Sequence, residues 1–99
     1  MSMETLAEAM NRLQKSGYTE AFRVEDQRLV TASGEHTFDP SDLHVDETVR
    51  FEGESNPSDM SILFALSDPG TGVRGTWSSS FGAEMAAGDA EVVRALEGR

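Results

Sequence analysis

The sequence contains no cysteine, so the chain forms no disulfide, no thiolate metal site and no cysteine nucleophile. It also contains no apolar run that approaches a membrane span. Met1 to Leu6 includes Glu4, where a secretory signal peptide would need an apolar core. We therefore expect a cytoplasmic protein with no membrane partner.

Basic residues are scarce, and Lys15 is the only lysine. The chain has 8 lysines and arginines against 18 aspartates and glutamates, and its formal net charge is -10. Phosphate backbones are bound by basic patches, whereas the arginines here are scattered among acids, so we expect no nucleic acid partner. Such a surface is typical of halophilic proteins, because salt screens the repulsion between like charges. An ordinary acidic protein from a GC-rich genome is the alternative.

The length of 99 residues predicts one domain, residues 1–99, with a modest core. Residues 45–51 alternate apolar and polar side chains, which predicts a strand with one face on the core and one in water. Residues 60–66 are apolar on both faces, which favours a central strand covered on both sides. A turn at residues 68–72 precedes renewed alternation over residues 73–81, so the last two strands are predicted to form an antiparallel hairpin.

Helices are predicted at both ends of the chain. Thr5 and Glu8 fit a capping box, an apolar stripe follows, and Gly17 is expected to end this helix in the left-handed conformation. Asp89 is expected to cap a second helix that Gly98 ends.

A weaker hairpin is predicted between the first helix and the central strands. Residues 18–24 and 28–31 supply its strands, and residues 25–27 supply its polar turn. Asp39 and Pro40 then predict a single helical turn. Together these elements predict an α+β fold: an antiparallel β-sheet of about four to five strands with an N-terminal and a C-terminal helix packed on it.

Two motifs invite a catalytic interpretation. Gly70 to Gly75 reads GxGxxG, which in dinucleotide-binding folds opens a helix, but here it opens a strand, so turn chemistry explains it better. Residues 78–80 are serines, but none lies in a Gly-x-Ser-x-Gly turn, and we expect them to face outward from a strand. Trp77 is expected to be a core anchor or a ring half covered by the N-terminal helix, and a ligand-stacking platform is the alternative.

His36 and His44 lie in a polar segment rich in acids. Their spacing matches neither a zinc motif nor a calcium loop, so a solvated loop is the better interpretation and we expect no metal. We expect no cofactor and no catalytic residue either. The neighbouring acids are Asp39, Asp42, Asp46 and Glu47.

Three stretches cover nearly the whole chain: TLAEAMNRLQKSGYTEAF, FDPSDLHVDETVRFEGESNPSDMSILFAL and GVRG. In this order and spacing they resemble a family of small bacterial proteins of similar length and no established activity. Family members are often labelled phosphoribosylpyrophosphate synthetases, which implies a phosphoribosyl or nucleotide-related enzyme or ligand binder as an alternative. The ribose-phosphate loop of those synthetases has two adjacent acids and leads to a helix. Here LFALSDPGTG has only Asp68 and leads into a strand, and SSSFGAEMAAGD replaces a Tyr-containing family segment.

We therefore expect a non-catalytic binding or regulatory module with an unknown protein or small-molecule partner, and a homodimer is one arrangement open to it. Residues 52–59 join two strands but are longer and more polar than a hairpin needs, and such loops often carry binding residues. Arg50 and Arg74 are expected to project from strands on either side of the same sheet region, where they could meet an anionic group or pair with Glu52 and Asp59, and pairing is favoured in so acidic a chain. The alternative is a loop that only shapes the turn. The predicted binding surface is Arg50, Glu52, Asn56, Asp59 and Arg74.

Overall fold

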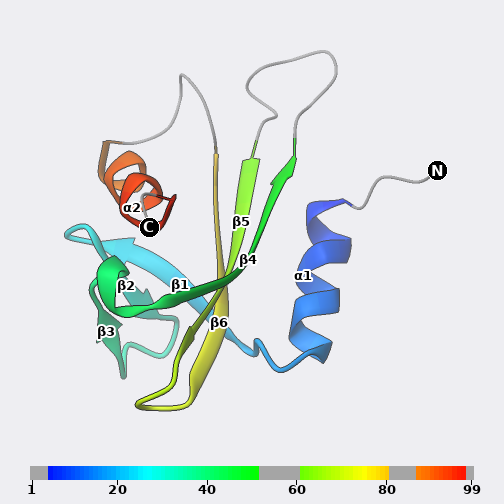
Figure 1. Ribbon diagram of the computed structural model, residues 1–99, viewed down its shortest axis with the longest axis horizontal. Coiled ribbons are helices and arrows are strands. Elements are labelled where there is room, and N and C mark those ends of the chain that lie inside the picture. The colour runs from blue at the N-terminus through cyan, green and yellow to red at the C-terminus, as the bar shows by residue number, and fades with distance from the viewer. Residues whose placement is uncertain (1–4, 52–60, 81–86, 98–99) are drawn as a thin grey trace.

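The computed structural model describes residues 5–51, 61–80 and 87–97, which form two α-helices, one 3-10 turn and six strands (Figure 1). The elements are α1 (Leu6–Lys15), β1 (Glu20–Glu25), β2 (Arg28–Thr31), β3 (Thr37–Phe38), η1 (Pro40–Asp42), β4 (His44–Phe51), β5 (Ser61–Asp68), β6 (Val73–Ser80) and α2 (Ala87–Glu97). The α+β class and the two terminal helices are confirmed.

The strands form one sheet in the order β3-β2-β1-β6-β5-β4. All neighbours are antiparallel except β1 and β6, which run parallel. The predicted sheet of about four to five antiparallel strands is therefore wrong in strand number and in this one pairing, because β3 was missed and β1 joins the β5–β6 hairpin directly.

Gly75 permits the junction between β1 and β6. The parallel pairing is short, with Glu20 opposite Gly75 and Ala21 opposite Thr76. A Cβ atom at position 75 would lie 2.5 Å from the backbone oxygen of Glu20, so a residue with a side chain would push the strands apart. The last glycine of the GxGxxG motif thus serves strand packing.

Two layers cover the central strands on opposite sides. In Figure 1, α1 lies on one side of β4, β5 and β6, while α2 and the β1–β3 strands lie on the other. Residues 62–66 of β5 are all 0% exposed, which confirms the prediction of a central strand covered on both faces. We call the two sides of the β4, β5 and β6 part of the sheet the α1 face and the α2 face.

The α2 face carries the larger core. Trp77 stacks on Phe64 with ring centroids 5.8 Å apart, so its predicted role as a core anchor is confirmed. It shares this core with Val92 and Val93 of α2, so of the two alternatives for Trp77 the one in which α1 half covers the ring is not the one observed. The buried residues of this core are Phe22, Leu29, Leu43, Ile62, Phe64, Leu66, Trp77, Val92, Val93 and Leu96.

Both ends of α1 are formed by the residues that the sequence predicted. Thr5 and Glu8 form both bonds of the capping box. Gly17 has φ +107°, and its N–H donates to the carbonyl of Gln14, while the N–H of Tyr18 donates to the carbonyl of Leu13 (3.0 Å). This Schellman arrangement satisfies the last carbonyls of the helix.

The start of α2 differs from the sequence prediction. The helix begins at Ala87, so Asp89 lies in its first turn and is not the cap. The Asp89 carboxylate instead accepts a hydrogen bond from the hydroxyl of Ser79 (2.9 Å), which is buried. The prediction that all three serines face outward is therefore wrong for Ser79, because strand alternation points it to the same face as Trp77. Gly98 lies outside the described residues.

A β-bulge in β4 changes which face its residues share. Val45 pairs with Leu66, but Glu47 pairs with Ala65, so Asp46 is the extra residue. Val45 consequently packs on the α2 face, whereas Val49 and Phe51 pack on the α1 face. The prediction that alternate residues from 45 to 51 share one core face is wrong for Val45.

The β1–β2 hairpin and the helical turn η1 are both present as predicted. Asp26 and Gln27 form the hairpin turn with φ 52° and 63°. Asp39 precedes Pro40, but its side chain makes no capping hydrogen bond and lies 3.8 Å from Arg28. The prediction that the Asp39 side chain caps this turn is therefore wrong.

Candidate binding site at the edge of the sheet

Strand β4 is one edge of the sheet, with β5 as its only hydrogen-bonded neighbour among the described strands. It is 8 residues long, whereas β3 at the opposite edge has 2. An edge strand presents backbone N–H and C=O groups that no strand inside the sheet satisfies, and a long edge presents more of them.

A hollow of about 750 Å³ lies beside this edge, between β4 and the last turn of α2. Its apolar part is Val45, which is partly buried, and Leu96, which is 3% exposed. Arg50 forms an ion pair with Glu97 at the rim, where their side chains are 47% and 31% exposed. The lining residues are His44, Val45, Thr48, Arg50, Leu96 and Glu97.

The α1 face of the same strand carries two carboxylates. Asp46 accepts a hydrogen bond from the hydroxyl of Tyr18 (2.8 Å), and Glu47 forms an ion pair with Arg12 (2.6 Å). Arg74 from β6 lies over the ring of Tyr18, 4.4 Å from its centroid. Arg12 thus joins α1 to β4, and Tyr18 joins the segment after α1 to β4 and β6.

The register separates the two arginines of the sequence-predicted surface. Arg50 pairs with Ile62 and belongs to the α2 face, whereas Arg74 pairs with Ser67 and belongs to the α1 face. The structure therefore does not bring them together around one anionic group. Glu52, Asn56 and Asp59 lie outside the described residues, and their part in the surface stays a prediction.

Sequence reasoning named Arg50 but missed the rest of the hollow. Alternation along β4 indicates which side chains share a face, and the apolar spacing of α2 indicates that Leu96 is buried. Neither pattern indicates that the end of α2 lies against β4. The missed lining residues are His44, Val45, Thr48, Leu96 and Glu97.

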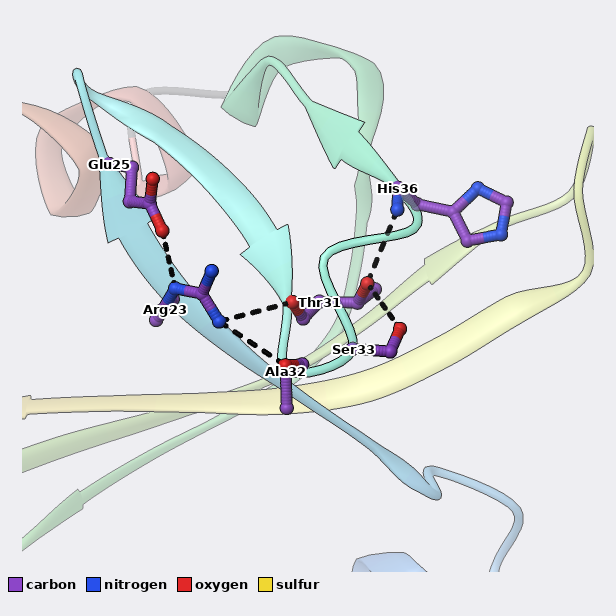
Figure 2. Close-up of polar contacts among 6 residues, drawn as sticks. All are labelled: Arg23, Glu25, Thr31, Ala32, Ser33 and His36. Carbon is purple, nitrogen blue, oxygen red and sulfur yellow. Dashed lines mark hydrogen bonds and ion pairs between the residues drawn. The ribbon is translucent and has the colours of Figure 1, made fainter.

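A second polar cluster supports the turn between β2 and β3 (Figure 2). Arg23 donates to the backbone oxygens of Thr31 (3.5 Å) and Ala32 (3.3 Å). The hydroxyl of Thr31, which is fully buried, accepts from the N–H of His36 (3.3 Å). Figure 2 shows the ring of His36 directed away from this cluster, and the ring stacks on Phe38. The cluster satisfies backbone groups of this turn.

The glycine-rich turn is closed by its own side chains. Asp68 accepts from the N–H (3.2 Å) and the hydroxyl (2.8 Å) of Thr71, and its backbone oxygen accepts from the N–H of Gly72. Gly72 has φ +79°, which glycine adopts readily. Strand β6 follows directly, so the prediction that the motif opens a strand is confirmed.

Within residues 5–51, 61–80 and 87–97, no three His, Asp or Glu side chains are grouped so that they could hold a metal ion. Neither of the helices described is long and apolar enough to cross a membrane. Comparison of the chain with protein-family models, with curated proteins and with solved structures gives no match. The function is therefore inferred from the geometry of β4 and the hollow.

Proposed function

We propose that this chain is a non-catalytic binding module that takes an extended segment of a partner protein along the outer edge of β4. One observation supports this most directly: an 8-residue edge strand lies beside a hollow between that strand and a helix. Extended peptides add to exposed sheet edges through backbone hydrogen bonds, and pockets beside the edge select their side chains.

The charge of the chain favours a basic segment over a second copy of the same chain. Each copy carries a formal net charge of -10, so two copies repel each other. A segment rich in lysine and arginine is attracted instead, and complementary charge accelerates its encounter with the edge. The proposed occupant is therefore a basic, extended segment of another protein.

Selection from a library of displayed random peptides tests the proposal. The intact chain is expected to enrich basic peptides, and their amide shift changes are expected to map to residues 44–51. Two substitutions, Thr48→Pro and Val49→Pro, then distinguish an N–H group of β4 that bonds to β5 from one that points outward. Adjacent N–H groups of a strand point to opposite edges, so one substitution removes a hydrogen bond to β5 and the other removes an outward donor.

The variant that keeps the melting temperature of the wild-type chain identifies the outward position, and it is expected to lose peptide binding. Binding at wild-type strength by that variant would contradict the proposal. Enrichment of no peptide by the wild-type chain would contradict it as well.

A non-catalytic role also makes a prediction for the phosphoribosyl or nucleotide alternative. Millimolar ATP, NAD or phosphoribosyl pyrophosphate with magnesium is expected to leave the amide signals of Gly70, Gly72 and Gly75 unmoved, because Asp68 and the backbone already occupy the polar groups of this turn. Saturable shifts at these glycines would favour the nucleotide-related activity instead.

A further inference from the structure

The two faces of β4 differ in chemistry along the edge where the segment is proposed to bind. On the α1 face, Asp46 contacts Tyr18 and Glu47 contacts Arg12, and the apolar Val49 and Phe51 lie further along the same face. On the α2 face, Val45 and Thr48 line the hollow. Because paired residues of neighbouring antiparallel strands project to the same face, a segment added to β4 would present its side chains to these two surfaces alternately.

The hollow suits an uncharged side chain. Arg50 and Glu97 pair with each other at its rim, so the local charge is balanced and neither sign is favoured. Val45 and Leu96 supply apolar contact at its base. An aliphatic side chain entering the hollow would remove the exposed part of Val45 from water without separating an ion pair, whereas Leu96 is already buried.

Beside Asp46, the α1 face suits a cationic side chain. Asp46 accepts a hydrogen bond from the neutral hydroxyl of Tyr18, and among the described residues it forms no ion pair. It is also exposed at the edge. A lysine or arginine opposite this position gains a charge-assisted bond, and the acidic chain favours its approach.

We infer, on the basis of the proposed function, that the segment recognised by β4 alternates basic and aliphatic residues, with the basic side chains on the α1 face beside Asp46 and Glu47 and the aliphatic ones on the α2 face. This pattern has the two-residue period of a strand. It distinguishes the partner from a segment that is merely basic.

Three synthetic peptides of equal length test the pattern by NMR titration of the intact chain. The first alternates lysine and valine, the second has the same composition with all lysines before all valines, and the third alternates glutamate and valine. We expect the first to bind about tenfold more tightly than the second, because several cross-strand pairs of up to about 1 kcal/mol each are lost in the block arrangement. The third is expected to bind most weakly.

Two matched threonine substitutions test the part played by the hollow. Thr48 and Thr37 are both exposed residues of edge strands, but only Thr48 lines the hollow. Thr48→Trp is expected to fill the hollow and reduce the affinity for the alternating lysine and valine peptide about tenfold, whereas Thr37→Trp leaves it unchanged. Asp46→Asn is expected to reduce that affinity about threefold and to weaken its dependence on salt.

Equal affinity for the alternating and block peptides would overturn the inference, and so would failure of the alternating peptide to bind. Unchanged affinity of Thr48→Trp would overturn it too. The proposed function fails separately, when the stable proline variant of β4 still binds the peptides selected from the random library.

Discussion

The two faces of β5 are equally buried but are built differently. On the α2 face, large side chains interdigitate around Phe64 and Trp77. On the α1 face the buried residues are fewer and include small ones, and polar contacts of Tyr18 lie at their margin. The buried residues of the α1 face are Ala9, Leu13, Tyr18, Leu63 and Ala65.

This difference indicates that the two faces stabilise the fold in different ways. Apolar burial stabilises in proportion to area, so we expect the α2 face, which buries more and larger apolar side chains, to contribute more to the free energy of unfolding. The small residues of the α1 face let the helix lie close to the sheet, and directional contacts set its position. The proposed binding edge lies where the two faces meet, at β4.

The largest expected effect comes from removing the centre of the α2 face. Phe64→Ala is expected to lower the free energy of unfolding by about 3 to 5 kcal/mol, because it deletes a fully buried ring stacked on Trp77. Chemical denaturation measures the loss. Leu63→Ala, one residue away on the α1 face, is the control and is expected to lose about 2 to 3 kcal/mol. An equal or larger loss for Leu63→Ala would show that the two faces contribute alike.

The junction between β1 and β6 tests whether the two parts of the sheet need close contact. Gly75→Ala is expected to lower the free energy of unfolding by about 1 to 3 kcal/mol, because its Cβ would overlap the backbone of Glu20. Gly88→Ala in α2 is the control: nothing lies within 4 Å of its Cβ. That substitution is expected to stabilise the helix by up to about 1 kcal/mol. An unchanged melting temperature for Gly75→Ala would show that β1 can shift without loss.

Tyr18→Phe tests whether the hydrogen bond between Tyr18 and Asp46 stabilises the α1 face. The substitution keeps the ring beneath Arg74 but removes the hydrogen bond to Asp46, so a loss of about 1 kcal/mol is expected. Asp46→Asn keeps an acceptor for the hydroxyl and is expected to lose less. If Tyr18→Phe is as stable as the wild-type chain, the hydrogen bond does not help to position α1.

The smallest effect concerns salt, which acts on both faces. The exposed pairs Arg12–Glu47 and Arg50–Glu97 each contribute at most about 1 kcal/mol, and salt weakens them. Screening of a net charge of -10 acts in the opposite direction and is expected to dominate, so the melting temperature should rise from low to molar KCl. A flat or falling melting temperature would contradict the halophilic interpretation.

The sequence by itself determined the elements whose causes are local. Thr5 and Glu8 cap α1, and Gly17 ends it, because the groups that satisfy these helix ends lie within a few residues of them. Apolar residues on both faces predicted that β5 is central, and the turn before Val73 predicted its pairing with β6. Arg50 was also predicted to belong to a binding surface, and that role stays a prediction. Its ion pair with Glu97 was not predicted.

Only the tertiary structure decided how these elements meet. Three features depend on residues far apart in the sequence: the parallel pairing of β1 with β6, the pairing of β4 with β5 around the bulge at Asp46, and the contact of α2 with β4. Periodicity indicates which side of an element is buried but not what covers it, so Arg50 and Arg74 were assigned to one surface although they lie on opposite faces. A bulge of one residue moves every following side chain of the strand to the opposite face of the sheet, and no local pattern in β4 indicates where the bulge lies.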